Sequence, residues 1–489
     1  MFRSFCVVLL SSLLTARCNG PASDAASSHT GETQTSSDHR IENVVIVTLD
    51  ATSAQFQDSI EFEPLRTFLS ENGYLRLQNY IDSATWTTEA IGRLTSGRHL
   101  DLTPGYYAEE AEYGKAGLPS TVPSVFTLAG QNGWQVQYST QNPLAGVHSG
   151  LAQGVPEEYY NAGAGTVNDV PEGDPLWDRQ ETELQFQTAS AQLDAWQAEN
   201  PDAQTLSWLH LMSLHDPFTS DVMDPSCWPD VQSLASSCSW EDLLVQGGPG
   251  AMQTNYHPPS EEDAEACEAA YKAADLCIAR GSIPALVSGL TQMQDAGHLG
   301  SDTLLMVSND HGECTGAEFS WDQDDNRDGV SDLDRCWLHY RPYLIDDQVQ
   351  GMGWIGWQGM APEDFVVSGA TSEVDLVPTI LDLTGMDPGT ATFDGIDMRE
   401  ASPERNVMTV FWNAETQRPV YRVTSGDGAY ALSWSPETPT DVFVNRERDP
   451  EFLVNLSDNP DAWTKDELVR YQEMSAQLND YYDAFLAVQ

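Results

Sequence analysis

An Asp-His pair is the part of the sequence with the clearest chemical meaning. Asp310-His311 follows an apolar run at residues 303–307 and precedes a glycine. In open α/β sheets, ligands bind at the carboxyl ends of the strands, where side chains converge. A carboxylate and an imidazole are ligands that suit Zn²⁺ or Mn²⁺ and also accept other divalent ions. Ordinary turns carry the same short sequence, so a metal site requires partners elsewhere in the chain.

Two such partners occupy comparable positions. Residues 41–50 form a Val- and Ile-rich apolar run that ends in Asp50, as expected for a buried strand. Thr87 lies in a hydroxyl-rich turn that leads into a short helix. A metal ion held by two carboxylates and an imidazole lowers the pKa of a coordinated hydroxyl. We therefore predict that Asp50, Asp310 and His311 bind a divalent ion, and that Thr87 attacks phosphorus or sulfur.

The elements that must hold these residues alternate between strand and helix patterns. The expected strands are residues 41–50, 77–80, 134–139, 205–210 and 303–307. The expected helices are residues 64–72, 122–133, 182–199, 261–279, 283–296 and 372–383. This alternation predicts an α/β fold with a mainly parallel central sheet.

The pattern changes near residue 405. Short alternating strands are expected at 407–412, 420–424, 429–433 and 441–444, before a helix at 465–486. We therefore predict a main domain at 41–404 and a smaller α+β subdomain at 405–489. Polar segments at about 219–258 and 314–336 are expected to be insertions in the main domain.

The amino-terminal residues resemble an export signal. Arg3 precedes an apolar core at residues 5–14, which is too short to span a bilayer, so residues 1–18 are predicted to be a signal peptide. Cys18 resembles the lipidated cysteine of a lipoprotein, although Arg17 stands where a small residue is expected; cleavage near Ala22 is the alternative. Residues 19–40 have almost no apolar side chains and are expected to form a disordered tether. We find no later apolar run of spanning length and expect a periplasmic, surface-anchored or secreted protein.

The composition is strongly acidic. Lys and Arg total 22 against 75 Asp and Glu, which gives a formal charge of −53. This charge argues against nucleic acid as a partner, because the phosphate backbone requires a basic surface. The charge fits a surface adapted to high salt, and it equally fits an acidic exported protein.

Six cysteines follow the leader, an even number that favours disulfides in an exported chain. Proximity in sequence suggests the pairs Cys227–Cys238 and Cys314–Cys336. Cys267 and Cys277 fall in one expected helix, where they are not expected to reach each other.

An acidic segment within the second insertion has the spacing of a calcium loop. Asp324, Asn326, Asp328 and Asp332 stand at positions one, three, five and nine, with Gly329 at position six. Position twelve is Arg335 in place of Glu. The segment is therefore either a structural calcium site or a solvated acidic loop.

Taken in order, the motifs resemble the sulfatase family of the alkaline phosphatase superfamily. The six matching segments are residues 43–50, 86–98, 210–218, 308–313, 374–383 and 394–395, and residues 441–456 resemble the family's carboxyl-terminal signature. Each motif is short, but six in the same order are specific. The resemblance implies an alkaline-phosphatase-like α/β/α sandwich with a smaller C-terminal lobe. It also implies a metal-dependent hydrolase of sulfuric or phosphoric esters, with a small-molecule, glycan or lipid ester as substrate.

Several positions depart from typical sulfatases. Their nucleophile is a formylglycine made from Cys or Ser in a Cys/Ser-x-Pro/Ala-x-Arg motif, whereas this chain has Thr87, Glu89 and Ile91 at the corresponding positions. Thr cannot give formylglycine, and family members with Thr there resemble phosphodiesterases and phosphoglycerol or phosphoethanolamine transferases. Ala51 replaces a second acid, His311 replaces an Asn, and the family's active-site lysines have no clear counterpart. These departures favour phosphoester or phosphodiester substrates.

The resemblance also implies a role for each matching residue. Asp50, Asp310 and His311 would bind Zn²⁺, Mn²⁺, Ca²⁺ or Mg²⁺, with Thr87 as nucleophile and fourth ligand. His215 would contact the anionic group or the leaving oxygen. The candidate substrate contacts are His210, Arg93 and His339, although an isolated histidine such as His210 or His339 is more often a hydrogen-bonded core residue. The alternatives to hydrolysis are a phosphoglycerol-type transferase, a sulfatase-like binding protein without activity, and a calcium-stabilised structural protein.

Overall fold

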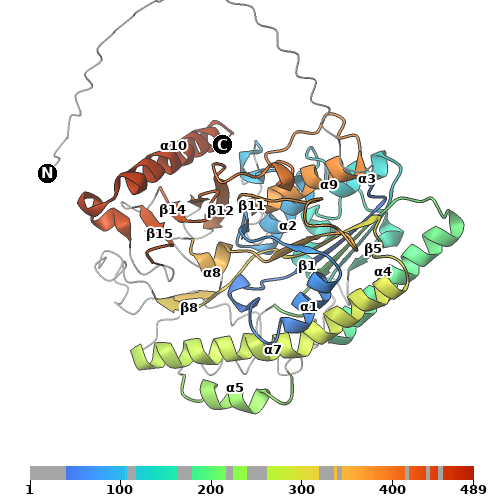
Figure 1. The fold of residues 1–489 in the computed structure, drawn as a ribbon, viewed down its shortest axis with the longest axis horizontal. Coiled ribbons are helices and arrows are strands. Elements are labelled where there is room, and N and C mark those ends of the chain that lie inside the picture. The colour runs from blue at the N-terminus through green and yellow to red at the C-terminus, as the bar shows by residue number, and fades with distance from the viewer. Residues whose placement is uncertain are drawn as a thin grey trace, which may run out of the picture. The chain divides into compact units, whose positions relative to one another are not determined.

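A seven-stranded sheet carries the predicted site residues (Figure 1). The computed structural model describes residues 40–104, 106, 117–162, 179–215, 224–238, 261–318, 335–338, 344–413, 418–436, 441–449 and 455–488. In their order across the sheet, the strands are β2 (Leu75–Arg76), β10 (Gly353–Gly356), β7 (Thr303–Asn309), β1 (Asn43–Leu49), β6 (Thr205–Leu211), β4 (Gln135–Thr140) and β5 (Tyr160–Ala162). The five strands from β7 to β5 run parallel, whereas β10 is antiparallel to β7 and β2.

Helices cover both faces of this sheet, which confirms the predicted α/β/α sandwich (Figure 1). Alternate residues of β1 point to opposite faces: Val44 and Ile46 pack into one hydrophobic cluster, and Val45 and Val47 into the other. The first cluster includes α2 (Thr87–Ser96), α3 (Val125–Gln131) and α9 (Leu376–Thr384). The second includes α1 (Glu63–Glu71), α4 (Arg179–Glu199) and α7 (Glu261–Asp295). Burial on both faces explains why the central strands are continuous apolar runs.

A separate antiparallel sheet follows the main sheet in sequence, as predicted. Its strands are β12 (Val407–Asn413), β13 (Arg418–Thr424), β14 (Tyr430–Trp434) and β15 (Val442–Asn445), and α10 (Lys465–Val488) packs against them. The exact boundary at residue 405 stays a prediction, because residues 39–489 form one compact unit by their contacts.

A two-stranded parallel sheet is separate from these two sheets. It pairs β3 (Tyr80–Ile81) with β11 (Thr371–Ser372). The strand expected at residues 77–80 is therefore wrong, because residues 77–79 form the turn that separates β2 from β3. Two two-residue strands leave too short a pattern for their alternation to show in the sequence.

Helix α7 replaces the two helices expected at 261–279 and 283–296. Gly281 and Ser282 lie between the two expected helices and Pro284 near the start of the second, but one helix continues through all three. Proline removes one backbone hydrogen bond inside a helix. Here α7 packs against α1, α4 and α5 (Trp228–Ala235), so tertiary contacts hold it together on both sides of the proline. The Ser282 hydroxyl also donates to the Ser213 carbonyl at 2.7 Å.

The disulfides differ from the predicted local pairs. Cys227 is bonded to Cys277 and Cys238 to Cys267, because α5 lies along α7 and the two cysteines that flank α5 are beside that helix. The pair Cys227–Cys238 is therefore wrong. Cys314, on β8 (Cys314–Glu318), is also in a disulfide, and β8 pairs with β9 (Arg335–Leu338). Its predicted partner, Cys336, stays a prediction.

Several predicted features lie outside the described residues. These are the signal peptide at 1–18, the tether at 19–40 apart from residue 40, His339, and the calcium-loop residues Asp324, Asn326, Asp328 and Asp332. Within the described residues, one segment, Glu262–Asp295 of α7, is long and apolar enough to cross a membrane. In its most apolar window 61% is buried inside the protein, as in the core helix of a globular domain.

Candidate active site

The parallel register places the first acid beside the Asp-His pair. Leu49 of β1 lies opposite Asn309 of β7, so Asp50 and Asp310 follow at the same level. Ligand atoms of Asp50, Asp310 and His311 all lie within 4.8 Å of one another, and the three residues are buried. The residues predicted to bind a metal ion are thus brought together at the carboxyl ends of adjacent strands, as the strand-end argument expects.

Thr87 is the first residue of α2 and points at this cluster. Its hydroxyl oxygen lies 3.3 Å from His311 Nε2 and 3.5 Å from both carboxylate oxygens of Asp50. Trp86, just before it, is in an extended conformation, so α2 begins abruptly at Thr87. The first backbone N–H groups of a helix have no partner within it and favour anions. The predicted nucleophile therefore lies where an anionic group can be bound.

Three side chains surround the Asp50 carboxylate. Asn142 Nδ2 donates to Asp50 Oδ2 at 2.6 Å, His210 Nε2 lies 2.9 Å from the same oxygen, and His215 Nε2 lies 3.6 Å from Oδ1. Asn142 Nδ2 also lies 3.3 Å from the Thr87 hydroxyl. This network fixes the orientation of Asp50 and joins it to Thr87.

His210 is held on its other side by a hydrogen-bond chain. Trp208 Nε1 donates to the Thr48 hydroxyl at 3.1 Å, and that hydroxyl lies 2.8 Å from His210 Nδ1. Nε2, on the opposite side of the ring, faces Asp50. Both ring nitrogens are thus engaged within the protein, which favours a positioning role, and a substrate contact at His210 stays a prediction.

Asp310 is engaged at one oxygen and open at the other. Its Oδ1 accepts from the backbone N–H of Ala51 at 3.0 Å and of His311 at 2.8 Å. Ala51 has φ of 53°, a strained conformation for a residue other than glycine, and such strain is typical of functional sites. Asp310 Oδ2 is buried and has no hydrogen-bond partner among the described residues. An unsatisfied buried carboxylate oxygen fits a metal ligand, so the donor set suits a divalent ion.

The two acids have opposite pKa shifts. Burial opposes ionisation of Asp50, but His215, His210 and His311 outweigh it and hold the pKa of Asp50 below its usual value. Burial, with a smaller contribution from the charge of Asp50, raises the pKa of Asp310 to about 7. Like charges in close contact produce such divergence, and a bound cation relieves it.

Arg93 contacts a different set of residues, Ser83 and Asp101. Its guanidinium is wholly buried, donates to the Ser83 carbonyl, and lies 3.1 Å from Asp101 Oδ1. Asp101 Oδ2 in turn accepts from the Tyr481 hydroxyl at 2.8 Å. These contacts indicate a structural role for Arg93 in joining α2 to α10, and a substrate contact at Arg93 stays a prediction.

Asn142 is the site residue that sequence reasoning missed. It follows β4 by two residues, next to Pro143, so it lies at a strand end just as Asp50 does. Asp50 and Asp310 were identified because they follow buried strands. The same criterion, applied to neutral polar residues, identifies Asn142. Its contacts with Asp50 and Thr87 place it in the centre of the cluster.

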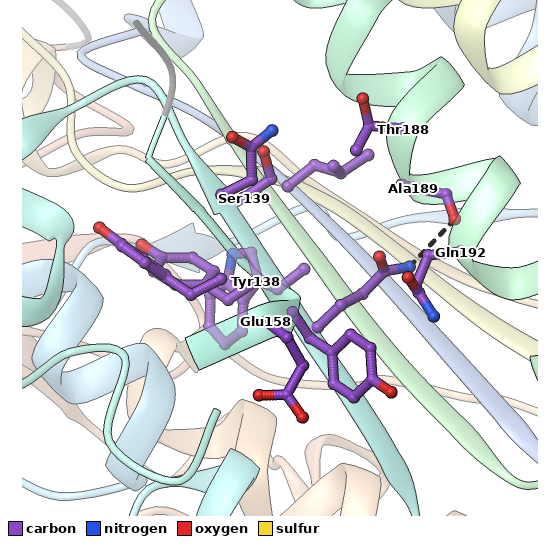
Figure 2. A pocket seen from close by; sticks show the side chains of 12 residues that line it. Tyr138, Ser139, Glu158, Thr188, Ala189 and Gln192 are labelled. Carbon is purple, nitrogen blue, oxygen red and sulfur yellow. Dashed lines mark hydrogen bonds between the residues drawn. The ribbon is translucent and has the colours of Figure 1, made fainter. Parts of the chain in front are cut away.

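A small pocket elsewhere on the sheet is separate from this cluster (Figure 2). It lies where β4 meets α4, and its wall includes Tyr138, Ser139, Glu158 and Gln192. Its volume of about 60 Å³ accommodates only a few water molecules. Asp50, Asp310 and His311 do not line this pocket.

Comparison with solved structures shows the fold. A 2-O GAG sulfatase superimposes with a TM-score of 0.59 at 13% identity, over 91% of this chain and 93% of that chain. The phosphonate monoester hydrolase of Silicibacter pomeroyi gives 0.59 at 15% identity, over 92% and 96%. The lipoteichoic acid synthase LtaP of Listeria monocytogenes gives 0.53 at 15% identity, over 91% and 92%. The chain has the alkaline-phosphatase-like fold of these proteins, as the resemblance implied.

Comparisons by sequence give no match. No family model matches the chain, and no curated protein matches it. The similarity of this chain to known proteins therefore lies in its fold.

Proposed function

We propose that this protein is a metal-dependent, sulfatase-like hydrolase that acts on phosphoric monoesters or diesters through Thr87. The single observation that carries the proposal is the position of the Thr87 hydroxyl, 3.3 Å from His311 Nε2 and 3.5 Å from Asp50. A hydroxyl at the start of a helix, beside two acids and an imidazole, is a common arrangement for an activated nucleophile. Thr in place of formylglycine favours phosphorus over sulfur as the atom attacked.

Asp50, Asp310, His311 and Thr87 would hold the divalent ion. When bound, the ion would lower the pKa of the Thr87 hydroxyl and offset negative charge on the ester oxygens. The ligands are oxygen and imidazole, which Zn²⁺ and Mn²⁺ both accept.

The chain's own residues account for the remaining steps. Thr87 Oγ gives up its proton to solvent and forms a bond to phosphorus as the bond to the leaving alcohol breaks, and the alcohol takes up a proton. His215 is nine-tenths buried and faces Asp50, so it is placed to donate that proton. Asn142 Nδ2 and the first N–H groups of α2 donate to the non-bridging oxygens. Water then attacks this phosphorus and His215 accepts its proton, while the bond from phosphorus to Thr87 Oγ breaks and Oγ takes up a proton from solvent.

Hydrolysis of aryl esters by purified protein tests the proposal. We expect activity on aryl phosphate monoesters or diesters that exceeds activity on aryl sulfate, and loss of that activity with a chelator. Thr87→Ala should abolish turnover, whereas Thr88→Ala, one position further along α2, should retain it. Activity that survives both the chelator and Thr87→Ala would refute the mechanism, and so would the absence of activity with every ester.

An alcohol acceptor distinguishes a transferase from a hydrolase. LtaP shares this fold and is named a lipoteichoic acid synthase, which makes transfer a specific second candidate. In a transferase, added glycerol would take the phosphoryl group from Thr87 and raise the rate of release of the first product. No product on glycerol, with water-driven turnover unchanged, would favour the hydrolase.

We also propose that the protein works outside the cytoplasm. The disulfides Cys227–Cys277 and Cys238–Cys267 fit an oxidising compartment. The resemblance of residues 1–18 to a signal peptide supports export. After export, Cys18 is either lipidated or removed by simple cleavage. Mass spectrometry of the mature amino terminus from the native host would distinguish a diacylglyceryl cysteine from a free terminus near Ala22.

A further inference from the structure

A second pair of acids lies at strand ends beside the candidate active site. Thr371 and Ser372 of β11 lie opposite Tyr80 and Ile81 of β3, in parallel. The next residues along each strand are therefore neighbours, and they are Asp82 and Glu373. This repeats, on a smaller sheet, the way in which β1 and β7 bring Asp50 and Asp310 together.

Each of these acids uses one oxygen and leaves the other without a partner. Asp82 Oδ2 accepts from Asn309 Nδ2 at 2.9 Å. Glu373 Oε2 accepts from the Ser83 backbone N–H at 2.8 Å and from the Ser83 hydroxyl. Asp82 Oδ1 and Glu373 Oε1 are buried in residues of 0% exposure, and neither has a hydrogen-bond partner within the described chain. Two open carboxylate oxygens therefore remain in the interior.

The surroundings compensate these two charges only weakly. The nearby cation is Arg93, whose guanidinium already lies 3.1 Å from Asp101 Oδ1. Burial, followed by the charge of Glu373, raises the pKa of Asp82 well above its usual value, and burial does the same for Glu373. Buried carboxylates in this state require either protons or a cation.

The tight packing around the pair keeps both open oxygens in the interior. A Cβ atom on Gly351 would lie 2.3 Å from Asp82 Oδ1 and 2.5 Å from the Tyr80 ring, so any side chain at that position would collide with the carboxylate. The hydroxyl of Tyr80 is buried close by and has no hydrogen-bond partner in the part of the chain that the structure describes. Both open atoms of the acid pair are carboxylate oxygens.

We propose that Asp82 and Glu373 bind a second, structural cation through Asp82 Oδ1 and Glu373 Oε1. An all-oxygen set favours a hard divalent ion such as Mg²⁺, Ca²⁺ or Mn²⁺. Asn309 holds Asp82 and is the residue before Asp310, so an ion at this position steadies the strand end that carries the first site. The inference does not depend on which ester the protein hydrolyses.

Metal content after chelation and reloading with Mn²⁺ tests the proposal. Glu373→Gln keeps the shape of the side chain and removes its charge, and Glu404→Gln, at an exposed position, is the control for net charge. We expect Glu373→Gln to retain one Mn²⁺ per chain fewer than the wild type and Glu404→Gln. Asp310→Asn should also retain one fewer, and the double variant two fewer. Equal Mn²⁺ in Glu373→Gln and Glu404→Gln would overturn the proposal and would indicate a shared proton in place of a cation.

This experiment tests the second metal site and the catalytic metal site independently. Loss of Mn²⁺ in Glu373→Gln but not in Asp310→Asn would support the second site and refute the catalytic one. If Glu373→Gln does not give a native circular dichroism spectrum, Asp82→Asn replaces it. The Asp310→Asn variant gives a further measurement, because its melting temperature should still rise with added Mn²⁺. No rise would overturn the second site.

Discussion

Asn142 donates to Asp50 at 2.6 Å and, with the same amide group, lies 3.3 Å from the Thr87 hydroxyl. One nitrogen therefore links a metal-type carboxylate to the candidate nucleophile. The amide carries no net charge, so its contribution is directional. It orients the carboxylate in the resting protein and can donate to the oxygens of a phosphoryl group on Thr87.

Replacing Asn142 should reduce turnover without blocking binding. We expect Asn142→Ala to lower kcat by about 10²-fold, because one preorganised donor to a developing oxyanion is lost, with little change in KM. Steady-state kinetics with an aryl phosphoester measure the effect. Asn161→Ala on β5 is the control and should retain wild-type kinetics. An unchanged kcat in Asn142→Ala would contradict a role in the transition state.

Removing His210 should weaken metal binding. His210 orients Asp50 from the far side, and loss of such supporting partners costs about 10- to 100-fold in metal affinity. We therefore expect His210→Ala to raise the Kd for Mn²⁺ in calorimetry by that factor. The buried His298, whose nearest acid is Asp194, provides the matched control, His298→Ala. Equal Mn²⁺ affinity in the two variants would show that His210 is only a packing residue.

Metal affinity should depend on pH through Asp310. Since burial raises the pKa of Asp310 to about 7 in the metal-free protein, an incoming ion must displace a proton below that pH. The affinity should therefore fall as the pH falls, by up to about tenfold per unit below 7, and should level off above it. Calorimetry with Mn²⁺ between about pH 5.5 and about pH 8.5, in two buffers of different ionisation enthalpy, measures both affinity and proton release. Constant affinity across this range would contradict displacement of a proton from Asp310.

The contact between α10 and α2 should affect stability more than activity. Tyr481→Phe removes the donor to Asp101, and an unsatisfied buried acceptor costs about 1–3 kcal/mol. We expect chemical denaturation to show this loss in the free energy of unfolding, with kcat nearly unchanged at temperatures below unfolding. Tyr482→Phe, one residue further along, should change stability by less than about 0.5 kcal/mol. A large loss of kcat with unchanged stability would assign Tyr481 to catalysis.

The sequence was sufficient to predict the main sheet and most of the catalytic cluster because both follow from strand ends. Apolar runs that end in Asp50 and in Asp310-His311 identify parallel strands and the edge at which their side chains meet. Thr87 was identifiable because it opens a helix after a hydroxyl-rich turn. Each of these signals depends only on a short segment of sequence, so it can be recognised without knowledge of the rest of the fold.

Long-range packing explains what could not be predicted. The partners of Arg93 include Val410, more than three hundred residues away, so its structural role is invisible in its own segment. Asp82 and Glu373 follow two-residue strands that produce no periodic pattern. The continuity of α7 through Pro284 depends on helices packed along it.

The pairing of α5 with α7 has a consequence for a chain that has been cut. Cys227–Cys277 encloses Cys238–Cys267, so both bonds cross any single cleavage site between residues 238 and 267. A protease that nicks the chain there leaves two pieces that migrate as one band on a non-reducing gel and separate only with a thiol reagent. The mobility of the cleaved chain on a non-reducing gel therefore shows whether the two disulfides formed, and so whether the protein folded in an oxidising compartment. No activity measurement is required.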